Sequence, residues 1–318
     1  MAIPRRKQIQ HAKTLIYHCS SRCVRQAYLC GRDVKTGKSL EHRRKWLEDR
    51  LLLLSQVYCI DIVGYSIMSN HYHAVLKVDP ARAKKLSEEE VVERWSRIHR
   101  CPNLLRLKFA GSKLSDAEQE ICQTLIGNLR DNLSNLSRFM GDLNEKIARM
   151  ANHEDECKGR FWEGRFNCQA VLDRESLLQT LCYVELNPVR AKMAKTPEKS
   201  QHTSLRRRLK VAKSGLLPFW NPALPRDKQS TTAIPIFFDE YLQLLDWTGR
   251  ILRRDKRGNI EPEAPPILER IGYMSERWIK VMQRQVSWNP KAVGSRGAMN
   301  SYAESLEKRW LWRLPEPI

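Results

Sequence analysis

The chain has 318 residues, and its 56 lysines and arginines against 36 aspartates and glutamates give a formal net charge of +20. A hydrophobic share of 42% argues against disorder along most of the chain. The length is sufficient for one large domain or two ordinary ones. The start lacks the apolar stretch of a signal peptide and no apolar run could cross a bilayer, so we expect a cytoplasmic protein. The charge predicts a polyanionic partner, for which nucleic acid is favoured over an acidic membrane surface.

The nine cysteines give no sign of a disulfide framework or a zinc site. Their number is odd, they are scattered along the chain, and no two are spaced as CxxC. We therefore expect reduced thiols.

The first part of the chain predicts three strands and one helix. In chain order they are a strand over 14–19, a helix over 38–56, and strands over 57–68 and 71–78. The polar stretch 20–26 predicts a bend after the first strand. Because only Ser69 and Asn70 separate the last two strands, we expect these strands to form a hairpin in the centre of the sheet.

A helical insert over about 80–158 follows the hairpin. Its predicted helices cover 87–99, 115–126 and 129–150. After it come a strand over 160–171 and a helix that Asp173 can cap and that should stop at Asn187 and Pro188. The order predicts an α+β fold, with a ferredoxin-like antiparallel sheet and helices on one face.

The composition shifts near residue 200. A basic stretch and several prolines follow, and helices are predicted over 237–252 and 266–285. We therefore divide the chain into a first domain over 1–200 and a mostly helical, basic C-terminal extension over 201–318.

Two histidines on one strand form the first candidate site. His71 and His73 are two residues apart, so both leave the sheet on one face, whereas Tyr72 and its apolar alternates leave on the other. Both imidazoles could then share a divalent metal. Taken alone, the pair is better explained as two ordinary surface histidines.

Tyr183 and Asn187 form the second candidate pair. They are four residues apart near the end of a helix and therefore share one helical face. A phenol can attack a phosphodiester if a metal or base offsets its pKa of about 10, and an amide oxygen is a hard metal ligand. The alternative is that Tyr183 is a packed helix aromatic.

Five segments together resemble a known family. They are YHCSSR (17–22), MSNHYHAVLKV (68–78), LSRFMGDLNEKIAR (136–149), GRFWEGRF (159–166) and YVELNPVRA (183–191). In this order they resemble the single-tyrosine HUH transposases, most closely the REP-associated tyrosine transposases, over about residues 10–200. HUH denotes two histidines around a bulky hydrophobic residue, which is Tyr72 here.

The resemblance implies a function for each of these residues. His71, His73 and Asn187 would bind Mg²⁺ or Mn²⁺, and Tyr183 would attack single-stranded DNA beside a hairpin. The products would be a 5′-phosphotyrosine link and a free 3′-hydroxyl, which the reverse reaction can rejoin. The resemblance also implies a bacterial, nucleoid-associated location. Asn187 agrees with the palindrome-associated branch, since mobile-element relatives often have glutamine there, and the C-terminal extension has no counterpart in the short mobile-element enzymes.

Basic and aromatic residues supply candidate DNA contacts. The candidates for phosphate binding are Arg22, Arg25, Arg160, Arg165, Arg190, Lys192, Arg206, Arg207 and Arg208. Trp288, Trp310 and Trp312 could stack on unpaired bases, although packing in a small helical core is the simpler interpretation.

Two other functions stay open. A catalytically silent, palindrome-binding regulator would keep the fold without the reaction, although the intact Tyr183 and histidines count against it. An RNA-binding protein on a ferredoxin-like sheet should expose aromatics on its central strands, whereas the last hairpin strand presents His71, His73, Val75 and Lys77. Whether the chain is a monomer or a homodimer stays open.

Overall fold

A five-stranded sheet forms the centre of the computed structural model, which describes residues 9, 14–24, 29–31, 37–211, 213–251 and 292–306. The strands are β1 (Ile16–Arg22), β2 (Ile60–Ile67), β3 (His71–Val78), β4 (Asn167–Val171) and β5 (Ala292–Val293). Their order across the sheet is β2-β3-β1-β4-β5. The first four are antiparallel to their neighbours, and β5, from the C-terminal part of the chain, pairs parallel with β4.

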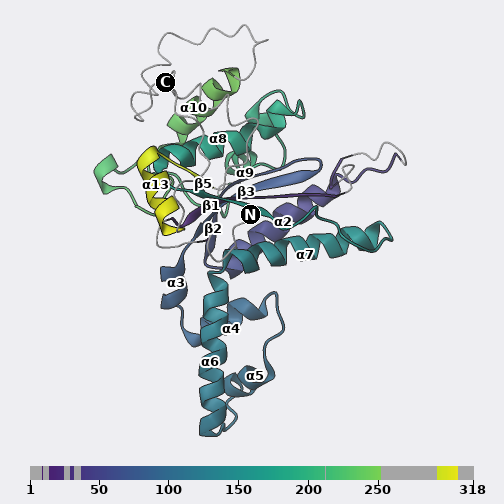
Figure 1. Ribbon diagram of the computed structural model, residues 1–318, viewed down its shortest axis with the longest axis vertical. Coiled ribbons are helices and arrows are strands. Elements are labelled where there is room, and N and C mark those ends of the chain that lie inside the picture. Colours follow the sequence, from purple (N-terminus) through teal and green to yellow (C-terminus); the bar gives the residue numbers. More distant parts are fainter. Residues whose placement is uncertain are drawn as a thin grey trace.

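Helices pack on both faces of this sheet (Figure 1). They are α2 (His42–Val57), α3 (Pro80–Lys85), α4 (Glu88–Ser96), α5 (Asn103–Phe109), α6 (Asp116–Leu133), α7 (Leu136–Glu154), α8 (Arg174–Arg190), α9 (Ser204–Lys210), α10 (Phe238–Ile251) and α13 (Arg296–Ser305), with 3-10 turns η1 (Pro197–Lys199) and η2 (Arg226–Lys228). The predicted class is confirmed: an antiparallel sheet with helices, a helical insert and, in the described C-terminal residues, the helices α9, α10 and α13. No helix within the described ranges is both long and apolar enough to span a bilayer.

The alternation of side chains along β3 divides the core into two layers. Tyr72, Ala74 and Leu76 belong to the apolar cluster that α2 and α7 cover. Val75 points the other way and belongs to a second cluster, with α8 and α10. The expectation of helices on one face therefore describes only half of the arrangement, because α8 and α10 cover the opposite face.

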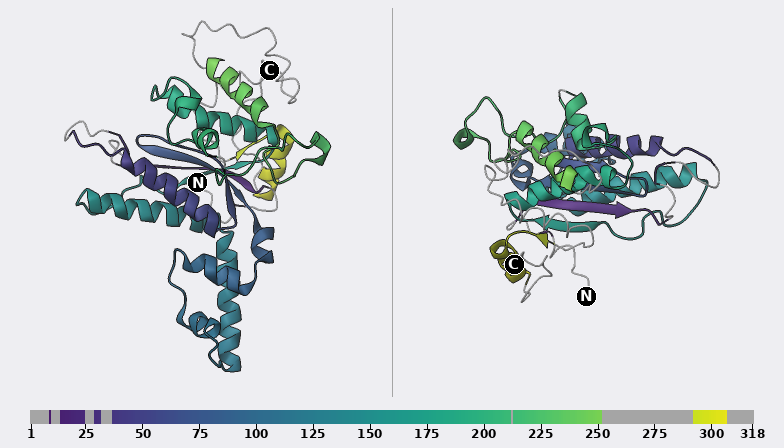
Figure 2. Two further views of the ribbon diagram at one scale, coloured as in Figure 1. Left: turned by 180° about the vertical axis from the view of Figure 1, so that it is seen from behind. Right: turned by 90° about the horizontal axis from the view of Figure 1, so that it is seen from above.

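Part of the insert projects away from the sheet. In Figures 1 and 2, α4, α5 and α6 form an arm below the sheet, whereas α8 and α10 lie above it. Ser87 and Ser115 begin α4 and α6 with reciprocal capping boxes, each closed by a glutamate three residues later. The single helix predicted over 129–150 is wrong, because α6 continues to Leu133 and the Asn135 side chain then caps α7 by accepting from the Arg138 amide.

Three predicted features of the strands are corrected. The hairpin of β2 and β3 lies at one side of the sheet rather than in its centre, since β1 pairs with both β3 and β4. The bend predicted over 20–26 begins later than expected, because Ser20, Ser21 and Arg22 pair with β3 and extend β1, and the chain bends at Val24. The strand predicted over 160–171 is confined to Asn167–Val171.

The segment before β4 is instead held by its aromatic side chains. Phe161, Trp162 and Phe166 are buried, and the Trp162 indole donates to the carbonyl of Asn144 at 2.9 Å. A bridge between Cys23 and Trp162 fixes this segment at the end of β1.

Helix α8 does not stop at Asn187 and Pro188, where the proline predicts its end. It runs through Pro188 to Arg190, and the Ala191 amide still donates to the carbonyl of Asn187 at 2.9 Å. Proline removes one helical donor, but the buried residues on both sides of it, Leu186 and Val189, keep the helix packed in the second core.

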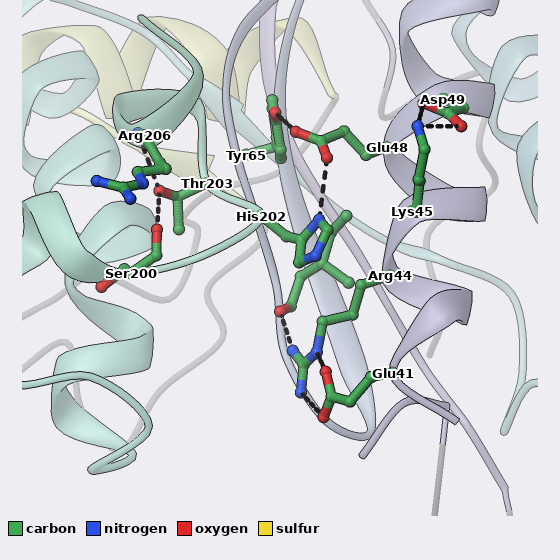
Figure 3. A network of polar contacts seen from close by, with 11 residues as sticks. Glu41, Arg44, Lys45, Glu48, Asp49, Tyr65, Ser200, His202, Thr203 and Arg206 are labelled. Atoms are coloured by element: carbon green, nitrogen blue, oxygen red, sulfur yellow. Dashed lines mark hydrogen bonds and ion pairs between the residues drawn. The ribbon is translucent and has the colours of Figure 1, made fainter. Parts of the chain in front are cut away.

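Polar contacts at the outer edge of β2 join the two layers. Glu48 of α2 accepts hydrogen bonds from the Tyr65 hydroxyl and from Nδ1 of His202, the latter at 2.9 Å (Figure 3). The Ile67 amide donates to the carbonyl of His202, and Ser66 bridges to Thr203. The chain leading into α9 therefore covers the exposed edge of the sheet.

Helices α9 and α10 share one core with α8. Tyr241, Leu244 and Leu245 of α10 and Leu205 of α9 are buried with α8 in the second cluster. The division of the chain near residue 200 stays a prediction. The helix predicted over 266–285 lies outside the described residues.

Candidate active site

His71 and His73 lie side by side on β3. Their ring centroids are 5.0 Å apart and their planes are nearly perpendicular. His73 is 7% exposed, and His71, the first residue of the strand, is half-buried. Both imidazoles leave the sheet on the face that α8 crosses, because they alternate with the core residues Tyr72 and Ala74.

Helix α8 brings Tyr183 to this pair. The Tyr183 ring stands edge-on to His73, with 5.5 Å between the ring centroids. The close approach of α8 to β2 depends on Gly64, since a β-carbon there would lie 2.6 Å from Cδ2 of Leu181. The structure thus joins residues more than 100 positions apart in the sequence.

Asn187 and Arg190 follow Tyr183 on the same helical face, one and two turns further along. The Asn187 amide donates through Nδ2 to the carbonyl of Tyr183 at 3.1 Å, which leaves Oδ1 as the side-chain acceptor. The guanidinium of Arg190 lies over the Tyr183 ring, 4.9 Å from its centroid. Its Nε and Nη2 atoms are buried and have no hydrogen-bond partner among the described residues.

A third histidine, which the sequence analysis missed, completes the cluster. His18 of β1 is 8% exposed, and its Nε2 lies 2.9 Å from Nδ1 of His73. Its ring centroid is 6.0 Å from that of Tyr183. On the other side, Nδ1 of His18 lies 3.3 Å from Oε1 of Gln169 on β4. The alternation of Tyr17, His18 and Cys19 signals that His18 faces away from the first core, but not which strand lies beside it.

Burial keeps these imidazoles neutral. It lowers the pKa of His18 to about 4, against a smaller opposing effect of the hydrogen bond with Gln169. Burial, assisted by the charge of Arg22, lowers the pKa of His71 to about 4. The pKa of His73 is also held well below its ordinary value by burial and by the neighbouring imidazoles and arginines. Neutral imidazole is the form that binds metals.

The donor atoms at this site fit a divalent cation. Nδ1 of His71 is engaged by Oδ1 of Asn70 at 2.6 Å, and Nδ1 of His73 by His18. Each histidine therefore has Nε2 left, and Nε2 of His73 is a buried atom without a partner among the described residues. No three His, Cys, Asp or Glu side chains in the described ranges are grouped to hold a metal. The amide oxygen of Asn187 is an oxygen ligand of another type, which hard divalent cations accept.

Apart from Arg190 beside Tyr183, the predicted phosphate contacts in the described ranges fall into two groups. Arg22, Arg160, Arg165 and Lys192 are exposed, and Arg22 pairs opposite His71 in the sheet. In the second group, Arg206 donates to the carbonyl of Glu198, Arg207 to that of Ser214, and Arg208 to those of Val63 and Leu217. These three arginines brace the C-terminal part, and DNA contact by any member of either group stays a prediction.

Four candidates lie outside the described residues: Arg25, Trp288, Trp310 and Trp312.

Glu185 of α8 points away from the histidines. It is 2% exposed and accepts from the hydroxyls of Ser204 and Tyr241. It therefore belongs to the contact between α8 and the C-terminal helices.

Comparisons with known proteins give one structural likeness. No protein-family model and no curated protein matches the chain. A solved structure described as the REP-associated tyrosine transposase bound to a REP hairpin is similar over 69% of this chain and 89% of that one. The identity is 14% and the TM-score 0.38, a distant relationship that by itself assigns no activity to this chain.

Proposed function

We propose that the chain is a metal-dependent single-stranded DNA endonuclease and strand transferase that acts beside hairpin DNA, with Tyr183 as its nucleophile. One observation carries the proposal. Tyr183 packs against His73, whose Nε2 is buried without a partner in the described part of the chain, and beneath the guanidinium of Arg190. The order of the HYH and YVELNPVRA motifs along the chain supports the same assignment.

In each step of the reaction one phosphodiester bond is broken and another is formed. The Tyr183 hydroxyl oxygen attacks the phosphorus in line, a bond forms between them, and the bond from phosphorus to the 3′ oxygen breaks. The tyrosine proton passes to solvent and the departing 3′ oxygen takes one up. Because the new 5′-phosphotyrosine bond keeps the energy of the old one, attack by a 3′-hydroxyl can rejoin an end without another energy source.

His71, His73 and Asn187 would hold Mg²⁺ or Mn²⁺ at this site. When bound, such an ion supplies positive charge that polarises the scissile phosphate and offsets the high pKa of a phenol. The protein contributes two neutral imidazoles and an amide oxygen. Arg190 adds a fixed positive charge over the ring of the attacking tyrosine, with donors that the described residues leave free.

Exposed basic residues around the site are suited to hold the nucleic acid. Arg22 ends β1 beside His71, Arg160 and Arg165 flank the aromatic segment docked there, and Lys192 follows α8. Their positions favour contacts with the phosphates of a hairpin stem next to the cleaved strand.

The test is covalent trapping on labelled single-stranded hairpin oligonucleotides that carry the palindromes flanking the gene. Wild type, Tyr183→Phe and Tyr302→Phe are incubated with Mn²⁺ or with chelator and resolved on a denaturing gel. Tyr302 of α13 is a matched control, because it is a buried tyrosine of the first core, away from the histidines. We expect a metal-dependent adduct with wild type and with Tyr302→Phe, and none with Tyr183→Phe.

Two results would overturn the proposal. Tight hairpin binding without cleavage under any metal would favour a palindrome-binding regulator on the same fold. An adduct that persists in Tyr183→Phe would assign the reaction to another nucleophile.

A further inference from the structure

Gln169, His18 and His73 form a line of hydrogen bonds across three neighbouring strands. Gln169 of β4 contacts Nδ1 of His18 on β1, and Nε2 of His18 contacts Nδ1 of His73 on β3, at 3.3 and 2.9 Å. All three side chains lie on the α8 face of the sheet and are nine-tenths buried or more. The line therefore runs within the protein rather than through solvent.

The chemistry of the end group gives this line a direction. The atom of Gln169 that meets His18 is the carbonyl oxygen Oε1, which can only accept a hydrogen bond. Nδ1 of His18 must therefore be the donor. A neutral imidazole carries one N–H, so Nε2 of His18 is an acceptor and Nδ1 of His73 must donate to it. The lone pair of His73 is then on Nε2.

Nε2 of His73 is the atom that has no partner among the described residues. A buried imidazole nitrogen with a lone pair and no donor nearby costs free energy unless something binds it. His71, the other histidine proposed to bind the cation, has the same arrangement. Oδ1 of Asn70 accepts a hydrogen bond from Nδ1 of His71, which leaves the lone pair of this ring on Nε2. Both histidines therefore offer the same nitrogen.

We infer that His18 and Gln169 are positioning residues which fix the tautomer and the ring orientation of His73, so that its Nε2 is prepared to bind the divalent cation. This inference rests on the proposed function, since the cation belongs to it. Partners of this kind behind a metal-bound histidine hold the ring and raise its basicity, and their loss typically weakens metal binding about 10–100-fold.

The first measurement is Mn²⁺ affinity of the full chain without DNA, by electron paramagnetic resonance. We compare wild type with His18→Phe, which keeps a flat ring but no acceptor, and Gln169→Leu, which removes the carbonyl. Both are expected to bind Mn²⁺ about 10–100-fold more weakly. Gln169→Glu keeps an acceptor at the same place and is expected to retain the affinity. Hairpin DNA binding in chelator should be unchanged in all three.

The second measurement reads the tautomer directly. Long-range proton–nitrogen spectra of the wild-type chain with nitrogen-15-labelled histidine, with His73→Ala to assign the signal, should show His73 protonated on Nδ1. A proton on Nε2 of His73 would overturn the inference even if a variant fails to fold.

Failure of the inference can be distinguished from failure of the proposed function. If wild type and both disrupted variants bind Mn²⁺ equally, the site stands and the positioning role is wrong. If wild type and His73→Ala are equally poor at binding Mn²⁺, the metal-dependent function is wrong, and the tautomer spectrum alone decides whether the hydrogen-bonded line exists.

Discussion

The guanidinium of Arg190 lies 4.9 Å from the centroid of the Tyr183 ring, two turns further along the same helix. Pro188 lies between them, and the contact exists only because α8 continues past it. Burial lowers the pKa of Arg190, but a guanidinium remains charged at any physiological pH. A positively charged side chain is thus held beside the candidate nucleophile, Tyr183.

Arg190→Gln should slow adduct formation about 10²–10³-fold, the usual loss when one preorganised group that stabilises developing charge is removed. Mn²⁺ affinity should be retained, since Arg190 donates and cannot ligate a cation. Lys192→Gln is the matched control, because Lys192 is exposed two residues further on. Single-turnover cleavage on hairpin oligonucleotides measures both. Equal losses in the two variants would mean that Arg190 contributes only general attraction for DNA.

Gly64→Ala should destabilise the protein by about 1–3 kcal/mol, because the new methyl group would lie 2.6 Å from Leu181 and press α8 away from β2. Adduct formation should fall as well, since Tyr183 is on the same helix. Gly127→Ala in α6 is the control, as nothing lies within 4 Å of a β-carbon there and alanine favours a helix. Urea unfolding measures the stability of both variants. An unchanged stability of Gly64→Ala would show that α8 and β2 are not closely packed at this position.

Glu48 should make stability depend on pH. Burial would raise its pKa, but the hydrogen bonds from His202 and Tyr65, with the charges of His202 and Arg207, outweigh burial and lower the pKa below its ordinary 4.5. The unfolded chain then binds more protons than the folded chain in this pH range. The contribution of Glu48 to the free energy of unfolding is therefore lost as the pH falls through 4.5 and below.

Glu48→Gln tests this dependence, because the amide does not titrate. The difference in urea midpoint between wild type and Glu48→Gln should be largest at pH 7 and should shrink toward pH 3.5. The contacts in question are those in Figure 3. A difference that stays constant over this range would contradict the assignment.

Tyr241→Phe should cost about 1–3 kcal/mol of stability, because it removes the hydroxyl that donates to the buried Glu185 at 2.8 Å. The loss should appear in the same cooperative transition as the unfolding of the sheet, since α10 and α8 share one core. Gln243→Ala, at an exposed position of α10, should be nearly neutral. An unchanged midpoint for Tyr241→Phe would mean that Ser204 alone satisfies Glu185.

The local periods in the sequence predicted the parts of the site that depend on one element. A period of two placed His71 and His73 on one face of β3, and helical spacing placed Tyr183 and Asn187 on one face of α8. Arg190 joins that face only in the structure, since the helix was predicted to stop before it. The predicted end of α8 at Pro188 was wrong, because packing of the surrounding residues outweighs the lost hydrogen bond. The sequence motifs also named the residue types for phosphoryl transfer, whose roles stay predictions.

Composition, alternation and spacing by themselves determined a basic α+β protein and the faces on which its candidate residues lie. Only the tertiary structure decided which strands are neighbours. His18 and His73 are separated by 55 positions and His18 and Gln169 by 151, and no local pattern states that their strands pair in this register. The physical reason is that a strand's period sets the direction of a side chain, whereas its partner is chosen by burial across the whole sheet.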